Sequence, residues 1–258
     1  MISKVVCRIL LMKGNLIMAY QMIFKRYELK YLLSAEQKEQ LIQAMKAYMA
    51  LDQYGHSIIR NIYYDTDSYR LIRRSLEKPA YKEKLRVRSY TKADENSAVF
   101  VELKKKYKSV VYKRRIVMPE RQVFGWLCGE DSCPLQNQIT KEIDYFCSFY
   151  ETLHPVVFLS YEREAFYSLG NDDFRITFDE NILYREEELS LEAEVWGSPI
   201  LDKGQVLMEI KTSGGIPIWM THFLTQHHIR KTSFSKYGIA YQMLLLKKEE
   251  KAGGKIYA

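Results

Sequence analysis

The stretch YKEKLRVRSYTKADENSAVFVELKKKYKSVVYKRRIVM, residues 81–118, contains three segments in which charged and apolar residues alternate. Successive side chains of a β-strand point to opposite faces of the sheet. The alternation therefore predicts three strands, 81–90, 98–107 and 110–118, each with one charged and one apolar face. Most of the side chains on the charged faces are basic: Lys82, Lys84, Arg86, Arg88, Lys104, Lys106, Lys113 and Arg115, with Glu102 among them.

The same alternation occurs in shorter segments on both sides of this stretch. In RYELKYL, residues 26–32, Glu28 and Lys30 alternate with apolar residues. The segments YEREAF, FRITFD and LMEIKT repeat the pattern at residues 161–166, 174–179 and 207–212. Several predicted strands thus carry basic residues on one face; those outside the first stretch are Lys30, Arg163, Arg175 and Lys211, with Glu28 and Glu209 nearby.

The formal net charge of +7 on 258 residues is concentrated in one part of the chain. Residues 78–115 contain thirteen basic and four acidic residues, whereas the remaining residues carry a net charge of minus two. Positive charge concentrated in this way predicts an anionic partner, such as nucleic acid, anionic lipid or a phosphate-rich small molecule.

The composition, with 47% hydrophobic and 28% charged residues, is that of a globular protein and excludes a disordered or fibrous chain. Apolar stretches near the N-terminus are interrupted by Arg8 and Lys13 and are too short for a membrane span. No GxxxxGK sequence is present, which excludes a P-loop. The cysteines are too few and too scattered for a disulfide framework, which indicates a reducing, cytoplasmic location; they are Cys7, Cys128, Cys133 and Cys147.

The chain is predicted to be a single α+β domain over residues 22–248, with a peripheral N-terminal extension (1–21) and a C-terminal tail (249–258). Besides the strands above, we expect strands at 23–33, 58–64, 156–166, 174–183 and 206–212. Helices are expected at 68–76, 119–127, 138–150 and 235–248. A further helix begins after Ser34, whose side chain forms a capping box with Gln37, and Ser235 is the expected N-cap of the last helix.

The charged strand faces have two interpretations. For one strand, the solvated face of an antiparallel sheet is the simpler. Across several strands, rows of like charge repel one another and are tolerated where a polyanion lies between them. Glu28, Glu102 and Glu209 each precede a lysine by two residues. Carboxylates beside cations suit a phosphate site that also holds Mg²⁺ or Mn²⁺. Pairing of each carboxylate with neighbouring lysines is the alternative, and for Glu102 the two are equally plausible.

The order of these segments resembles the VTC domain, the polyphosphate polymerase domain of the vacuolar transporter chaperone complex. The resemblance rests on nine segments between about residues 24 and 246: FKRYELKYLL, IIRNIYYDT, KLRVRSY, FVELKKK, VYKRR, YEREAF, FRITFD, LMEIKTSGGIPIW and SFSKYG. The family belongs to the triphosphate tunnel metalloenzymes, relatives of the CYTH phosphatases. The resemblance therefore implies an eight-stranded antiparallel β-barrel that forms a tunnel with a basic lumen, with helices packed outside.

The resemblance also implies roles for individual residues. Glu209 would be the metal ligand, with Glu28 a weaker second one, and the cofactor would be manganese or magnesium. Catalytic residues would be Arg86, Arg88, Lys104, Arg163 and Lys211. By resemblance, the phosphate-binding residues would be Lys30, Arg86, Arg88, Lys104, Lys113, Arg163 and Arg175, with Ser235 and Lys236 near the tunnel mouth. Parity adds Lys84 and Arg115 to the phosphate-binding residues and places Lys211 on the same face.

Two positions depart from the family pattern. The tunnel superfamily carries an ExExK sequence on its first strand, and Arg26 stands here at the first of these positions. This departure weakens the case for a two-metal site. A basic residue often lies two positions before the serine of the FSK motif, where this chain has Ser233.

The predicted function is transfer of the ATP γ-phosphate onto a growing polyphosphate chain, with ATP and phosphate oligomers as partners. A hydrolase of tripolyphosphate or nucleoside triphosphates is the alternative within the same fold. A module that binds polyphosphate or inositol phosphates without turnover is the non-enzymatic alternative. Nucleic acid is not an expected partner because no recognition motif is present. A membrane-protein partner is compatible with the family but is not visible in the sequence.

Overall fold

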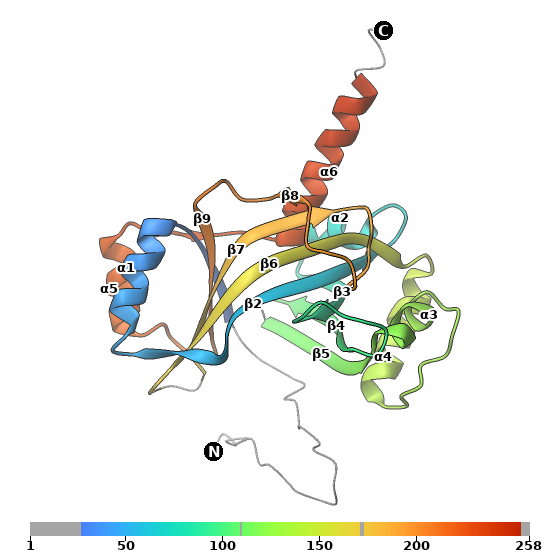
Figure 1. Ribbon diagram of the computed structural model, residues 1–258, viewed down its shortest axis with the longest axis horizontal. Coiled ribbons are helices and arrows are strands. Elements are labelled where there is room, and N and C mark those ends of the chain that lie inside the picture. Colours follow the sequence, from blue (N-terminus) through green and yellow to red (C-terminus); the bar gives the residue numbers. More distant parts are fainter. Residues whose placement is uncertain (1–26, 109, 171–172, 254–258) are drawn as a thin grey trace, which may run out of the picture.

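The computed structural model describes residues 27–108, 110–170 and 173–253. One antiparallel sheet and the helices around it make up this part of the chain (Figure 1). The strands are β1 (Tyr27–Ser34), β2 (Met49–Asp65), β3 (Tyr81–Ser89), β4 (Ala98–Tyr107), β5 (Val110–Pro119), β6 (His154–Ser168), β7 (Arg175–Arg185), β8 (Ser198–Pro199), β9 (Gln205–Thr212) and β10 (Lys231–Thr232). The helices are α1 (Ala35–Met45), α2 (Arg70–Leu76), η1 (Glu120–Gln122), α3 (Val123–Leu127), α4 (Gln138–Tyr150), α5 (Ile218–Gln226) and α6 (Lys236–Gly253).

Eight of the strands in the described part of the chain are long, as expected for the tunnel fold, and β8 and β10 have two residues each. The hydrogen-bonded order is β10-β1-β9-β7-β6-β2-β3-β4-β5, with β8 beside β7. Among these residues the sheet does not close into a complete barrel. β10 and β5 are its two edge strands, and no backbone ladder joins β5 to β1 or β10, because β1 pairs with β9 on one side and with β10 on the other. A salt bridge spans the opening instead, with 2.6 Å between Lys104 Nζ on β4 and Glu28 Oε2 on β1.

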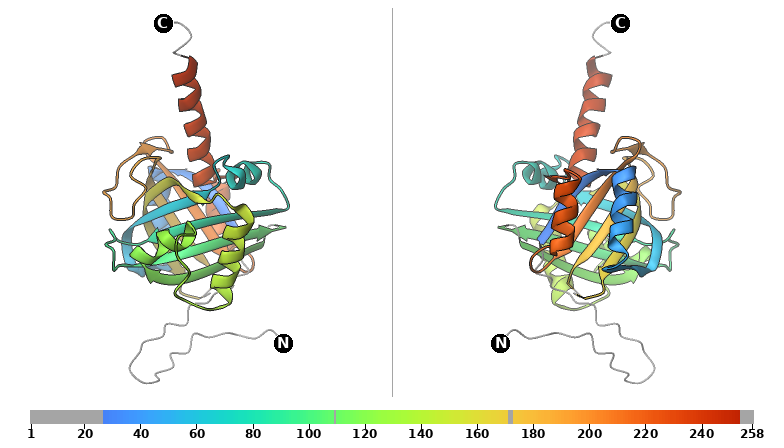
Figure 2. Two further views of the ribbon diagram at one scale, coloured as in Figure 1. Left: turned by 90° about the vertical axis from the view of Figure 1, so that its right-hand side faces the viewer. Right: turned by 90° about the vertical axis from the view of Figure 1, so that its left-hand side faces the viewer.

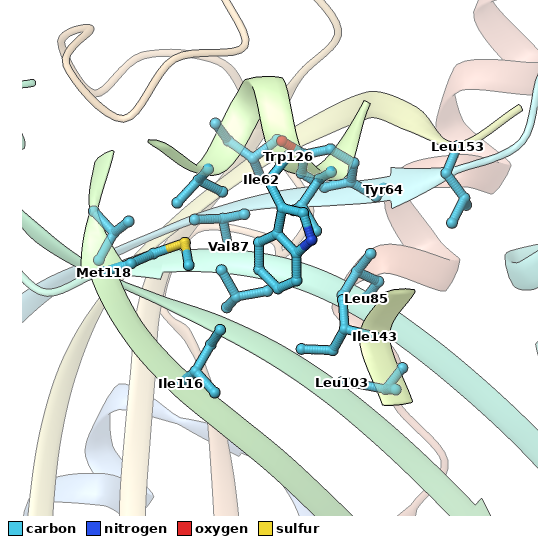
Figure 3. Close-up of a cluster of buried hydrophobic side chains, with 14 of the residues drawn as sticks. Ile62, Tyr64, Leu85, Val87, Leu103, Ile116, Met118, Trp126, Ile143 and Leu153 are labelled. Atoms are coloured by element: carbon cyan, nitrogen blue, oxygen red, sulfur yellow. The ribbon is translucent and has the colours of Figure 1, made fainter. Parts of the chain in front are cut away.

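Apolar residues on the outer faces of the strands form two clusters, each covered by helices (Figure 2), and a third cluster lies inside the curve of the sheet. Helices α3 and α4 cover β3, β4 and β5, where Trp126 and Ile143 pack against Leu85 and Leu103 (Figure 3). On the other side of the molecule, α1 and α5 cover β1, β9 and β7. These clusters explain the alternation in residues 81–118, because the apolar residues of each strand face the helices and the charged residues face the interior of the curved sheet.

The third cluster lies at one end of that interior and includes the first turns of α6. Tyr237 of α6 stacks on Tyr63 of β2, with 4.8 Å between the ring centroids. Its hydroxyl donates a hydrogen bond of 2.8 Å to Asp65. The remainder of α6 projects from the body of the molecule (Figure 1). The interior is therefore polar and charged over part of its length and apolar where α6 enters.

Several boundaries differ from those predicted. β2 begins at Met49 rather than at 58, and its pairing with β6 shifts register between Leu51 and His56. Gly55, with a φ of 55°, lies in that irregular segment, which hides the strand pattern from a reading of the sequence. α5, β8 and β10 were not predicted. α6 continues to Gly253, five residues beyond the predicted end of the last helix at 248.

Other expectations are confirmed or lie outside the description. Ser34 accepts a hydrogen bond from the Gln37 backbone, and the Gln37 side chain accepts one from Ser34 N, which is the predicted capping box. The N-terminal extension, Cys7 and the first residues of the strand predicted at 23–33 lie outside the described residues. None of the helices in the described ranges is long and apolar enough to cross a bilayer.

Candidate active site

The strand register places the predicted basic residues on one shared face, which lines the interior of the curved sheet (the lumen face). Arg86 lies opposite Glu102, which lies opposite Arg115 on the next strand. Lys84, Lys104 and Lys113 form a second such row. The rows on the other side of the lumen pair Lys30 with Glu209, Glu28 with Lys211, Lys211 with Arg175, and Arg163 with Asp179.

Glu102 on β4 is the anionic centre of one side of the lumen. Its side chain is 1% exposed, and its two oxygens lie 2.7 Å from Arg86 Nη2 and 2.7 Å from Lys113 Nζ. Arg115 Nε donates a third hydrogen bond, of 2.7 Å. Burial alone would raise the pKa of Glu102, but the charges of Arg86 and its neighbours outweigh it and hold the pKa well below its ordinary value. Both oxygens are therefore engaged, and pairing with cations is the role that the structure gives this carboxylate.

Asp179 and Glu209 form the anionic centre of the other side. Arg163 donates two hydrogen bonds to Asp179, of 2.6 and 2.7 Å, and Lys236 Nζ lies 2.5 Å from the same carboxylate. Glu209 lies 3.2 Å from Lys30 and 3.3 Å from both Lys211 and Lys236. Burial raises the pKa of Glu209, but the lysine charges outweigh it and hold the pKa well below the usual range.

Arg88 and Lys84 differ from the cations around Glu102, Asp179 and Glu209 because their hydrogen-bond partners are neutral. Arg88 is 5% exposed; its Nε donates to Asn61 Oδ1 and its Nη2 to the Tyr161 hydroxyl, both at 2.9 Å. Lys84 Nζ donates to Ser235 Oγ at 2.8 Å. Burial, reinforced by Lys30 and Lys104, lowers the pKa of Lys84 well below its ordinary value. Within the described ranges neither side chain has a carboxylate within salt-bridge distance.

Ser235 and Lys236 lie where the chain enters α6, so the predicted FSK residues join the same site. Ser235 Oγ accepts a hydrogen bond from Gly238 N at 3.0 Å, which confirms it as the N-cap. The same oxygen accepts from Lys84, so it contacts the lumen. Lys236 is 8% exposed, and Asp179 and Glu209 raise its pKa although burial lowers it. Arg175 is exposed at the start of β7 and marks one end of the lumen face.

Sequence reasoning missed four lumen residues. Asp179 shares a face with Arg175 in FRITFD, and this parity was the available signal. Asn61, Tyr63 and Tyr161 orient Arg86 and Arg88 through their side-chain oxygens. Tyr161 shares the parity of Arg163 in YEREAF, which was the same kind of signal, whereas Asn61 and Tyr63 lie in IIRNIYYDT, which reads as a buried strand.

Residues 25–245 match the VTC domain. The chain belongs to the VTC domain family. No curated protein matches its sequence significantly. This VTC domain has the fold of a putative adenylate cyclase from Bacillus halodurans, with 14% identity, a TM-score of 0.53, and coverage of 83% of this chain and 96% of that one. A putative adenylyl cyclase from Hippeastrum, described as having a dominant triphosphatase activity, is also similar, with 14% identity, a TM-score of 0.51, and coverage of 85% and 94%.

The VTC family and the tunnel fold together support a protein that handles triphosphates or polyphosphates. The sequence predicts manganese or magnesium as the cofactor, with Glu209 and Glu28 as the residues that would hold it. Glu28 and Glu209 lie diagonally across the β1–β9 pair, and the lysines beside them hold both in the ionised form, with the pKa of Glu28 lowered to about 2. The described residues contain no cluster of three potential metal ligands. Two ionised carboxylates on neighbouring strands suit a cation that also binds substrate phosphates, as is usual for Mg²⁺.

Proposed function

We propose that this protein is a phosphotransferase that moves the γ-phosphoryl group of ATP onto a growing polyphosphate chain within its lumen. The observation that carries the proposal is the pair Arg88 and Lys84, two enclosed cations on the lumen face with neutral partners. A buried charge without a counter-ion is costly, and an anionic substrate supplies the missing charge.

In the lumen, carboxylates orient the arginines, and the arginines bind phosphate oxygens. Glu102 fixes Arg86, and Asp179 fixes Arg163, through two N–H donors each. A guanidinium has five N–H donors, so each arginine keeps others for phosphate oxygens. Fixed cations around the transferred group stabilise charge that develops in the transition state without reorganisation.

The reaction needs little proton chemistry. The bond between the γ-phosphorus and the bridging oxygen of ATP breaks, ADP leaves, and the same phosphorus bonds to a terminal oxygen of the acceptor phosphate. That oxygen is already ionised near neutral pH, so no strong general base is required. A divalent cation held by Glu209 and Glu28 with the substrate phosphates would neutralise part of the charge on their oxygens. Lys30 and Lys211 hold Glu209 in place beside the substrate.

The test is Arg88→Gln against Arg114→Gln. Arg114 is on β5 but faces outward, where it pairs with Glu142 at 2.9 Å. Each protein is incubated with ATP, Mn²⁺ or Mg²⁺ and a short phosphate primer, and long chains and free phosphate are measured separately. We expect Arg88→Gln to lower kcat/KM for chain synthesis by about 100-fold, or about 2.7 kcal/mol, and Arg114→Gln to leave it near wild type. Undiminished synthesis by Arg88→Gln would contradict the proposal.

Hydrolysis of triphosphates is the second candidate, and the triphosphatase activity attributed to the Hippeastrum protein favours it. Water would then replace the acceptor phosphate while the same cations bind the substrate. The same incubation separates the two, because a hydrolase releases free phosphate and forms no chains at any primer concentration.

A further inference from the structure

A group of lysines lies at the end of the lumen where the rows of cations continue beyond Lys84 and Lys104. Lys82 and Lys106 face each other across β3 and β4, one row further along the same face. Lys231 on β10 is exposed at the edge of the sheet; it pairs with Tyr31, so it starts from the outer face, and its charge reaches Lys106 beside the opening of the ladder. We call Lys82, Lys106 and Lys231 the lysine lip. Neighbouring strands are about 4.8 Å apart, so Lys82 and Lys106 continue the lumen rows, and Lys231 adds positive charge at the rim.

The lip differs from the two carboxylate centres because it lacks counter-ions. Within the described ranges no carboxylate lies within salt-bridge distance of its lysines; Lys82 Nζ instead donates to Ser75 O at 3.3 Å. Glu28, which acts on Lys106 at longer range, already pairs with Lys104. Like charges placed directly opposite each other on adjacent strands are destabilising. An arrangement of this kind is tolerated where an anion with several charges occupies the space.

The charges of neighbouring lysines lower the pKa of Lys82 and of Lys106. Burial and the charge of Lys106 lower the pKa of Lys82. Burial and the charge of Lys104 lower the pKa of Lys106, and Lys231 contributes in the same direction. Lys30, which contacts Glu209 deep in the lumen, influences both.

We propose that the lysine lip binds the part of a linear polyphosphate chain that extends beyond the lumen, and so determines the end through which that chain passes. This inference rests on the proposed function. A short phosphate oligomer held by Arg86, Arg88 and Lys84 does not reach the lip, whereas a long chain does. The lip therefore contributes to affinity for long chains and to their retention between additions, and contributes little to affinity for short ones.

The test compares two triple variants with the same loss of charge. Lys82→Gln/Lys106→Gln/Lys231→Gln removes the lip. Lys92→Gln/Lys105→Gln/Lys141→Gln removes three lysines outside the lumen face: Lys92 pairs with Glu194, Lys105 lies near Glu142, and Lys141 is exposed on α4. Binding of tripolyphosphate and of long-chain polyphosphate is measured at two salt concentrations, because affinity for a polyanion that displaces counter-ions falls with salt.

For the lip variant we expect at least a tenfold loss of affinity for the long chain, a weaker salt dependence, and less than a threefold change for tripolyphosphate. Products made by that variant should also be shorter. The control variant should match wild type in both affinities. The proposal for the lysine lip is wrong if the lip variant binds long chains as tightly as the control variant does. It is also wrong if the lip variant loses affinity equally for the long chain and for tripolyphosphate. If the wild-type protein binds both ligands but forms no chains, the polymerase proposal is wrong. The comparison of binding by the two triple variants still tests whether the lysine lip binds long chains. Gln relieves the repulsion, so we expect the lip variant to be no less heat-stable than wild type.

Discussion

At the scale of single residues, the lumen contains two kinds of cation. Arg86, Lys113 and Arg115 surround Glu102, and that carboxylate sets their positions. Arg88 and Lys84 have only neutral partners. The positive charge of the first kind is neutralised by Glu102. The positive charge of the second kind has no carboxylate beside it, and we propose that an anionic ligand neutralises it. Parity of charged residues in the sequence places both kinds on the same face and does not distinguish them, because the difference depends on contacts between distant strands.

Lys113 gives the site a pH dependence. Burial lowers the pKa of Lys113, the charge of Glu102 raises it, and the charges of Arg115 and Arg88 lower it further, so that the pKa is about 8. Above pH 8 the Lys113 ammonium group of the ligand-free protein is deprotonated. A bound anion favours the protonated, positively charged form. Tripolyphosphate binding should therefore weaken as pH rises from 8 to 10 and should take up protons, measured by calorimetry in buffers of different ionisation enthalpy.

The matched variants are Lys113→Arg and Lys105→Arg. Arginine stays protonated throughout this range, so Lys113→Arg should take up fewer protons and lose less affinity above pH 8, while Lys105→Arg should follow wild type. The same pKa affects stability with the opposite sign. Between pH 8 and about 10.5 the unfolded chain holds a proton that the folded one has released, so this lysine makes the ligand-free protein more stable as pH rises. Proton uptake that is identical in all three proteins would argue against Lys113.

At the scale of elements, Asp65 joins β2, α2 and α6. It is 0% exposed and accepts hydrogen bonds from the backbone of Thr66, Leu71 and Ile72 and from the Tyr237 hydroxyl, all at 2.8–2.9 Å. The residue before α2, Tyr69, provides no side-chain cap. Asp65 therefore accepts hydrogen bonds from the free backbone N–H groups at the start of α2, and through Tyr237 it also holds α6 in place.

Asp65→Ala should lower the free energy of unfolding by about 3 kcal/mol, because it leaves several buried donors unpaired. Asp67→Ala is the control in the same turn; Asp67 is exposed, and we expect a change within about 0.5 kcal/mol. Urea unfolding measures both. Equal stability of the two variants would show that α2 and α6 do not depend on this carboxylate.

The sequence predicted the long strands and most helices because their signals are local. The alternation in 81–118 and the Ser34–Gln37 capping box are complete within a few residues. α5 was missed because IWMTHFLTQ lacks an amphipathic pattern, and its position becomes clear only where Met220 and Phe223 pack onto the sheet. β10 has two residues and exists only through its pairing with β1. The roles of Asn61 and Tyr161 depend in the same way on a partner strand.

At the scale of the whole molecule, the lumen concentrates charge that the folded protein must hold together. Cations outnumber carboxylates on the shared face, and the hydrogen-bonded ladder between β10 and β5 is open in the described part of the chain. The Lys104–Glu28 bridge and the Lys84–Ser235 hydrogen bond span the lumen instead. The fold therefore accepts internal repulsion, and a ligand that removes this repulsion should stabilise all of its elements together.

Tripolyphosphate should accordingly raise the melting temperature of the protein. A ligand at 100 times its Kd stabilises the folded state by about 2.7 kcal/mol, which for a protein of this size corresponds to roughly 5–10 °C. Arg88→Gln should show a much smaller rise at the same concentration, because its Kd is higher, whereas Arg114→Gln should show the wild-type rise. Scanning calorimetry at several ligand concentrations measures the effect. Because Arg114 carries the same charge on the outer face, an equal loss in both variants would mean that the anion binds to the general surface of the protein, and that the lumen is not its site.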